Sequence, residues 1–254
     1  MLTKRESSFM ISENTIFGRE RELAVLTRRL AQRQSFLLHG PAGIGKTALA
    51  CALLPGHSEI LYCPDASSKQ VIFRSIATAL AANHKHAAGV LGGSREIKTR
   101  SAVSLKGIVL DLLLAGEYWV ALDHLRMPSQ VFAADIKEIV GRALTPVLGI
   151  ARSDHMEDVG FLKSLFIDRS EKMELHAFDD AHAGQFAKQV MKGVGIAASN
   201  AGELLTRVVQ LSRGNPGAIV TMLSMAKLPK YRSGEQILVS PLYVDFRLRS
   251  VASR

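Results

Sequence analysis

The stretch Gly40-Pro41-Ala42-Gly43-Ile44-Gly45-Lys46-Thr47 decides the fold of this chain. It fits the pattern G-x-x-x-x-G-K-[ST], in which glycines let consecutive backbone N–H groups turn inward around an anion. The lysine of such a loop reaches the β- and γ-phosphates of a nucleotide, and the threonine hydroxyl holds Mg²⁺. We therefore interpret residues 40–47 as a phosphate loop. The candidate nucleotide contacts are Gly40, Gly43, Ile44, Gly45, Lys46, Thr47 and Ala48.

The residues on either side of the phosphate loop support this interpretation. Residues 36–39 read as a short buried strand, and residues 47–54 read as a helix. A helix that begins at the loop would add the positive end of its dipole to the phosphate site.

Composition limits the classes of protein that are possible. The chain has 254 residues, enough for one large domain or for one core with a small appendage. It has no run of apolar residues long enough to span a membrane, and residues 1–6 lack an apolar signal core. Cys51 and Cys63 lie in apolar segments and read as reduced core residues. We therefore expect a cytoplasmic protein without a membrane partner.

Strand-like and helix-like segments alternate through the first two thirds of the chain. The expected strands after the loop are 59–63, 118–122, 146–151 and 173–176, and the expected helices are 69–82, 103–114 and 130–142. The polar, glycine-containing stretch 84–100 reads as a loop. This alternation predicts an α/β fold with a doubly wound parallel sheet.

The alternation stops near residue 178, and the pattern after it is helical. We expect helices at 181–190, 201–212 and 217–226. Asn200 with Glu203 resembles a capping box, and Gly214 is a plausible helix stop. The prediction is a core at 1–178 and a small helical lid with a basic tail at 179–254. A strand pair is expected within 237–249.

Asp123 follows the apolar strand 118–122, at the end of the sheet where ligands bind in open α/β folds. It is therefore the second candidate anchor for Mg²⁺, together with Thr47. Many hydrolysing phosphate-loop proteins carry an acid directly after this aspartate, to orient the attacking water. His124 stands there in this chain, which favours slow hydrolysis or a nucleotide-binding switch.

Two arginines complete the candidate catalytic set. Arg152 follows the strand 146–151 at the same sheet edge, and the alternative is a solvated strand-end arginine. Arg169 precedes the last strand, where it can reach the site of a neighbouring subunit as a finger. The alternative for Arg169 is an ion pair with Asp168, Asp158 or Glu171.

The order of these motifs resembles the AAA+ and STAND branch of P-loop ATPases. It begins with "FGRERELAVL" from Phe17, continues through the phosphate loop, Asp123, Arg152 and Arg169, and ends with "GNPGAI" from Gly214. The resemblance implies a five-stranded sheet of order 5-1-4-3-2, and ATP with Mg²⁺ as cofactors. It places Phe17, Gly18, Arg19 and Pro216 at the adenine and gives Lys46, Asp123, Arg152 and Arg169 catalytic roles.

Two further features separate this chain from the family pattern. Gly217 stands where many AAA+ proteins place a lid arginine near the γ-phosphate, and STAND-type relatives also lack that arginine. The sequence stops soon after the lid, so it resembles a stand-alone ATPase module that acts through partners.

The formal net charge of +9 favours an acidic partner such as DNA, although a generic basic surface is the alternative. Candidate phosphate contacts are Arg95, Lys98 and Arg100, and in the tail Lys227, Lys230, Arg232, Arg247 and Arg249. Tyr231 and Tyr243 offer base stacking, or packing in the protein. The leading hypothesis is an oligomerising ATPase switch in a DNA-linked process such as transposition or replication, with a transposase, nuclease or effector as protein partner. The rivals are a signalling or defence switch without DNA contact and a scaffold that does not hydrolyse nucleotide.

Overall fold

The computed structural model describes residues 16–252. The prediction about residues 1–6 lies outside the described residues. Contacts between residues divide the described chain into two compact units. We call residues 19–41 and 46–175 the core unit. Residues 16–18, 42–45 and 176–252 form the lid unit. The lid unit thus includes the tip of the phosphate loop, and the predicted boundary at residues 178 and 179 stays a prediction.

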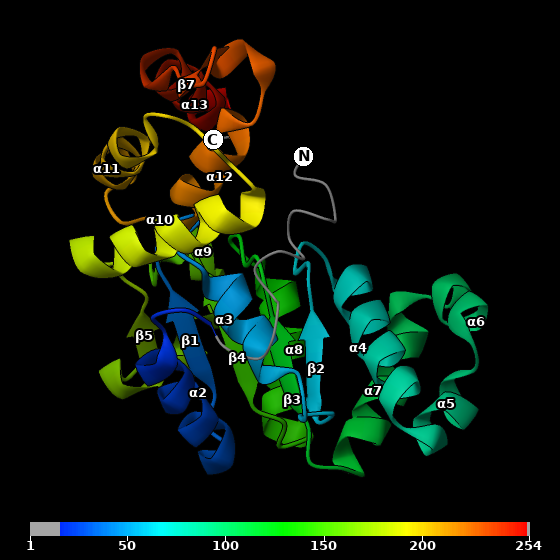
Figure 1. Cartoon of the computed structure of the whole chain (residues 1–254). Helices are drawn as coiled ribbons and strands as arrows, with labels where there is room; N and C mark the ends of the chain where they lie inside the picture. The colour runs from blue at the N-terminus through cyan, green and yellow to red at the C-terminus, as the bar shows by residue number, and fades with distance from the viewer. Residues whose placement is uncertain (1–15, 253–254) are drawn as a thin grey trace. The chain divides into compact units, whose positions relative to one another are not determined.

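A parallel five-stranded sheet forms the centre of the core unit (Figure 1). Its strands are β1 (Phe36–His39), β2 (Ile60–Cys63), β3 (Trp119–Leu122), β4 (Val147–Ala151) and β5 (Lys172–Glu174). The order β2-β3-β4-β1-β5 confirms the predicted order, read here from the opposite edge. Strands β3 and β4 are buried along their whole length, which explains why their sequences are continuously apolar.

Helices and short 3₁₀ turns connect the strands. They are α2 (Glu20–Gln32), α3 (Lys46–Leu53), α4 (Lys69–Asn83), α5 (Lys85–Leu91), α6 (Ser94–Thr99), α7 (Ala102–Leu114), α8 (Gln130–Arg142), α9 (Met156–Val159), η2 (Gly160–Leu165) and η3 (Arg169–Glu171). Ser68, Ser101 and Ser129 cap α4, α7 and α8, each accepting a backbone N–H with its hydroxyl. These caps fix the helix starts to within a residue of the predicted ones.

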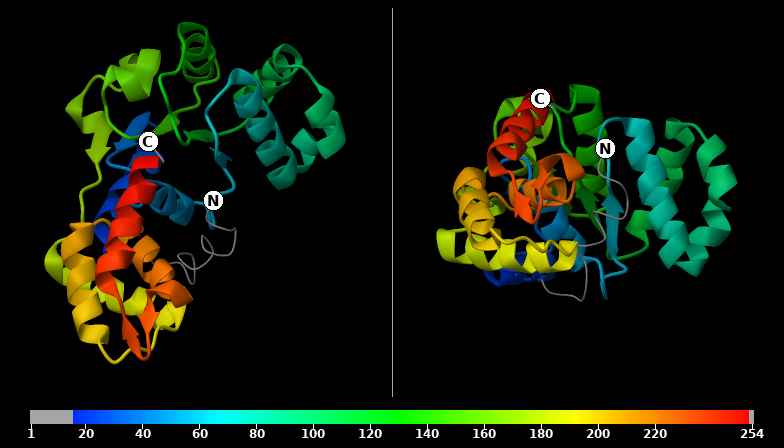
Figure 2. Two further views of the ribbon diagram at one scale, coloured as in Figure 1. Left: turned by 90° about the horizontal axis from the view of Figure 1, so that it is seen from above. Right: turned by 45° about the horizontal axis from the view of Figure 1, so that its top comes forward.

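The prediction of a loop at 84–100 is wrong, because this stretch forms α5 and α6. Ala87 and Leu91 lie four residues apart and are buried in α5, and Ile97 is the buried residue of α6. The glycines at 89, 92 and 93 obscure this helical character in the sequence. Figures 1 and 2 show α4 to α7 gathered beside the β2 edge of the sheet.

The lid unit is mostly helical, in agreement with the prediction. Its elements are α10 (Asp180–Val194), α11 (Ala201–Ser212), α12 (Pro216–Ala226), η4 (Pro229–Tyr231), β6 (Arg232–Ser233), β7 (Gln236–Ile237) and α13 (Val239–Ala252). The lid unit has its own hydrophobic core, whose buried members include Leu204, Val208, Ile219 and Leu223. Helix α13 packs on α11 and α12, and Figure 2 shows it in red.

Two local predictions in the lid unit are wrong. The expected strand pair at 237–249 is mainly helix α13, because Leu242 and Phe246, one turn apart, pack into the lid core. The Asn200 side chain caps no helix. It instead donates to the Ile237 carbonyl and accepts from the Ile237 N–H, both at 2.9 Å, and so ties α11 to the short β6–β7 hairpin.

Within residues 16–252, no helix has both the length and the apolar character that a membrane crossing requires.

Candidate nucleotide site

The phosphate loop connects β1 directly to α3. Its three glycines have positive φ values of 147° at Gly40, 77° at Gly43 and 102° at Gly45. Side chains disfavour this backbone region, so the glycine spacing of the motif is a requirement of the turn.

Lys46 lies over the loop that precedes it. Its Nζ donates to the carbonyl oxygens of Gly40 at 2.6 Å and of Pro41 at 2.9 Å. Burial lowers the pKa of Lys46, the carboxylate of Asp123 opposes that shift, and the positive charge of Arg152 adds to it. The lysine is therefore held at the loop by backbone oxygens that a phosphate group is able to replace.

Thr47 and Asp123 meet at the carboxyl end of the sheet. The Thr47 hydroxyl donates to Asp123 Oδ2 at 2.8 Å, and the His124 N–H donates to Asp123 Oδ1 at 2.7 Å. Asp123 is only 1% exposed. A hydroxyl and a carboxylate are hard oxygen groups that suit Mg²⁺, which takes its remaining oxygens from phosphate and water. These two residues therefore fit the metal of an ATP complex.

Tyr62 is a member of this group that the sequence analysis missed. Its hydroxyl donates to Asp123 Oδ2 at 2.7 Å, the same oxygen that accepts from Thr47. No motif marks a tyrosine in β2. The signal lies in the strand register, which pairs Tyr62 with Ala121 and Cys63 with Leu122 and so brings Asp123 next to the end of β2.

His124 has a left-handed backbone, with φ of 57°. Its ring is largely exposed, and Nε2 lies 4.0 Å from Asp123 Oδ2. Hydrogen bonds from the Leu125 N–H to the Ile150 carbonyl and from the Met127 N–H to the Asp158 carbonyl hold the segment that follows. The residue in place of the second acid therefore stands beside the carboxylate but faces solvent.

The two candidate arginines have different surroundings. Arg152 follows β4, is exposed, and lies near enough to Lys46 for its charge to affect the lysine pKa. Arg169 opens η3 and is exposed. Among the described residues it forms none of the predicted ion pairs, and Asp168 and Glu171 instead complete a capping box around η3.

The residues expected at the adenine lie in both units. In the lid unit, Phe17 packs against Phe178 and Phe186, with ring centroids 6.0 and 5.7 Å apart, and Pro216 is the buried first residue of α12. In the core unit, Arg19 is buried and pairs with Glu22 at 2.9 Å. Gly18 has φ of 64°. Their contact with adenine stays a prediction.

Within the lid unit, the start of α12 is bonded to the tip of the phosphate loop. Asn215 Nδ2 donates to the Ala42 carbonyl at 2.9 Å, and the Gly217 N–H donates to the Gly43 carbonyl at 2.8 Å. A Cβ on Gly217 would lie 2.8 Å from both the Cα and the carbonyl oxygen of Gly43. The structure therefore has no room for any side chain at the position where many AAA+ proteins carry arginine.

The basic residues proposed to contact DNA occupy several elements. Arg95 and Lys98 are exposed on α6, and Arg100 follows that helix half-buried. The tail cations Lys227, Lys230, Arg232, Arg247 and Arg249 are exposed.

The two tyrosines of the lid unit pack within the protein. Tyr231 is only 1% exposed and donates to Asp245 at 2.7 Å, which confirms packing in the protein, the alternative to base stacking. The half-buried Tyr243 stacks on Phe246, with ring centroids 6.5 Å apart.

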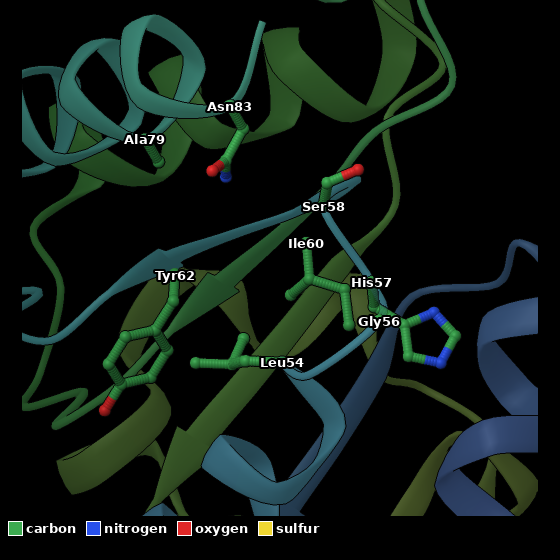
Figure 3. A pocket seen from close by; sticks show the side chains of 8 residues that line it. All are labelled: Leu54, Gly56, His57, Ser58, Ile60, Tyr62, Ala79 and Asn83. Carbon is green, nitrogen blue, oxygen red and sulfur yellow. The ribbon is translucent and has the colours of Figure 1, made fainter.

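A cavity of about 520 Å³ opens beside the edge strand β2 in the core unit (Figure 3). It is lined by Leu54, Gly56, His57, Ser58, Ile60, Tyr62, Ala79 and Asn83. Figure 3 shows the Tyr62 ring at one end of the cavity, with its hydroxyl directed away from Asn83.

Comparison with known proteins finds no matching family model and no matching curated protein. Solved structures do match. The Orc1 protein of Aeropyrum pernix, solved in complex with DNA, gives a TM-score of 0.63 at 17% identity over 96% of this chain and 69% of that one. A Walker-type ATPase of Pyrococcus abyssi gives 0.57 at 18% identity over 96% and 75% of the two chains. A STAND protein of Pyrococcus horikoshii with a tetratricopeptide repeat sensor gives 0.51 at 15% identity over 91% and 32%. The sheet order, the phosphate loop and these likenesses agree: the chain has the fold of the AAA+ and STAND P-loop ATPases.

Proposed function

We propose that this protein is a cytoplasmic ATPase that binds ATP with Mg²⁺, assembles into homo-oligomers, and acts as a nucleotide switch in a DNA-linked process such as transposition or replication. One observation carries the nucleotide part of the proposal. Lys46 lies at the phosphate loop, and Thr47 shares a hydrogen bond with the buried Asp123 at the adjoining sheet edge.

The residues have separate tasks in this proposal. The loop N–H groups receive the phosphates, and Lys46 exchanges the carbonyls of Gly40 and Pro41 for phosphate oxygens. Thr47 and Asp123 would hold Mg²⁺, which neutralises phosphate charge when bound. Arg152 adds positive charge at the same edge. His124 offers no carboxylate to orient water, which favours slow hydrolysis.

Replacing Lys46 with alanine tests the nucleotide site. Each lost charge-assisted contact is worth about 1.5–3 kcal/mol, so affinity for a fluorescent ATP analogue should fall at least about tenfold. Lys137→Ala, an exposed lysine on α8, is the matched control and should bind like wild type. A Lys46→Ala protein with wild-type affinity and turnover would contradict the proposal.

The exposed Arg169, without an ion pair among the described residues, supports a role toward a neighbouring subunit. Arg169→Ala should keep ATP binding and lose hydrolysis. Mixing it with Lys46→Ala should restore turnover, because one chain supplies the loop and the other the arginine. No recovery in demonstrably mixed oligomers would remove the finger role from Arg169.

Two observations support the proposed role in a DNA-linked process. Arg95, Lys98 and Arg100 lie together on and directly after α6, and the fold is similar to that of an Orc1 protein solved with DNA. Reversing the charges of Arg95, Lys98 and Arg100 should weaken binding to duplex DNA of any sequence and flatten its salt dependence. The control reverses three exposed lysines elsewhere, Lys137, Lys163 and Lys188, so that the change in net charge is the same. Equal losses in both variants would mean that the attraction is not localised at α6.

A second candidate function is a STAND-like signalling or defence switch with a separate effector and no DNA contact. Gly217 in place of the lid arginine and the likeness to a STAND protein favour it. Wild-type protein that binds no DNA at low salt, with or without ATP, would select this candidate.

A further inference from the structure

We propose that Tyr62 is a positioning residue for the Mg²⁺-dependent step, because its hydroxyl fixes the orientation of Asp123. The proposal rests on the proposed ATP·Mg²⁺ function and names a residue that no sequence motif assigns.

The Asp123 carboxylate accepts two hydrogen bonds from side-chain hydroxyls and one from a backbone N–H. Oδ2 accepts from Tyr62 at 2.7 Å and from Thr47 at 2.8 Å, and Oδ1 accepts from the His124 N–H at 2.7 Å. The carboxylate is almost completely buried, so it depends on these donors to offset the cost of removing its charge from water.

Only one of the two donors to Oδ2 belongs to the phosphate loop. Thr47 is the residue whose hydroxyl would turn toward the metal of a bound nucleotide. Tyr62 comes from β2, and the parallel register with β3 holds that strand beside Asp123. The tyrosine therefore keeps the carboxylate in place whether Thr47 bonds to it or to the metal.

The Tyr62→Phe variant isolates the hydroxyl. The ring forms one wall of the cavity at β2 and would remain there in phenylalanine (Figure 3). Tyr118→Phe is the matched control, because Tyr118 is a half-buried tyrosine of the same unit whose ring packs on His84.

The experiment titrates binding of a fluorescent ATP analogue with Mg²⁺ and repeats the binding in EDTA. Tyr62→Phe should bind the analogue in EDTA within about twofold of wild type. The Mg²⁺ concentration for half of the metal-dependent gain should rise at least about tenfold, the size expected for one lost hydrogen bond to a charged group. Tyr118→Phe should change neither value.

A double-mutant cycle with Asp123→Asn completes the test. If Tyr62 acts through Asp123, Tyr62→Phe should change the Mg²⁺ requirement little once the carboxylate has been replaced. A Tyr62→Phe protein with an unchanged or lower Mg²⁺ requirement, or an equal effect in the Asp123→Asn background, would overturn the assignment. Lys46→Ala in the same titration separates the two proposals, because wild-type binding by that variant would overturn the nucleotide site itself.

Discussion

Asp123 in the core unit and Gly217 in the lid unit are fixed in the structure in opposite ways. At Asp123, three polar groups converge on one buried carboxylate, and two of them are side-chain hydroxyls. At Gly217, a backbone N–H bonds the Gly43 carbonyl, and the approach is possible because the side chain is missing. The first arrangement depends on which groups are present and the second on a group that is absent. Substitutions at the two positions should therefore fail for different reasons.

The largest effect is expected from Asp123→Asn, which keeps the shape and removes the charge. Two hydroxyl donors lose a charged acceptor, each such bond being worth about 1.5–3 kcal/mol, so Mg²⁺-dependent turnover should fall at least about a hundredfold. A steady-state phosphate-release assay measures this loss. Asp111→Asn, an exposed position on α7, should leave turnover unchanged. Full activity in Asp123→Asn would mean that the carboxylate charge is not needed.

Gly217→Ala tests the other position. Alanine is normally favoured over glycine in a helix by about 1 kcal/mol, but here its Cβ would meet Gly43 backbone atoms at 2.8 Å. We expect a loss of about 1–3 kcal/mol in the free energy of unfolding, measured with denaturant. Gly184→Ala in α10, with nothing within 4 Å of the added Cβ, should stabilise instead. Destabilisation of equal size in both variants would remove the special role of Gly217.

A smaller and opposite effect is expected at His124, next to the carboxylate. His124→Glu should raise turnover several-fold, because a carboxylate orients water better than an imidazole that faces solvent. The variant should keep the ATP affinity of wild type. His86→Glu, exposed on α5, is the control for added negative charge. If His124→Glu binds ATP normally and turns over no faster, a difference from the family pattern other than His124 limits hydrolysis.

The smallest effect concerns His39, which ends β1 just before the phosphate loop. Burial lowers its pKa below the ordinary value of 6.5, although Asp154 and Glu174 oppose the shift. The unfolded chain therefore takes up the proton first, and stability is lost as pH falls below about 7. His39→Gln should flatten this fall between about pH 7 and pH 5 in denaturant titrations. His86→Gln should keep the wild-type slope, and an unchanged slope in His39→Gln would exclude His39 as its source.

The sequence predicts the parts of the fold and of the candidate site that depend on local spacing, and not those that depend on contacts between distant segments. The motif and the strand before Asp123 place Lys46, Thr47 and Asp123, because each belongs to a pattern of local spacing. Tyr62 could not be found in this way, because its bond depends on the register between β2 and β3, whose residues are far apart in the chain.

Local patterns also misled where tertiary contacts took precedence. Asn200 has the spacing of a capping residue, yet Ile237 engages its side chain. The glycines between residues 84 and 100 suggested a loop, yet Leu91 and Ile97 are buried in two short helices. In each case a partner distant in sequence decides the local structure.

The strand order has a consequence for how the chain is made. Of the five strands in the parallel sheet, β1 leaves the ribosome first, yet its two neighbours in that sheet, β4 and β5, are the last of the five to follow. At a synthesis rate of about 5–20 residues per second, the apolar segment from Phe36 to Leu38 waits on the order of ten seconds for β4. During that time both of its edges lack their final partners, and such edges readily pair with other chains. During synthesis, β1, the strand that leads into the phosphate loop, is thus the segment most exposed to pairing with the wrong strand. It is also the segment that a chaperone would protect most usefully.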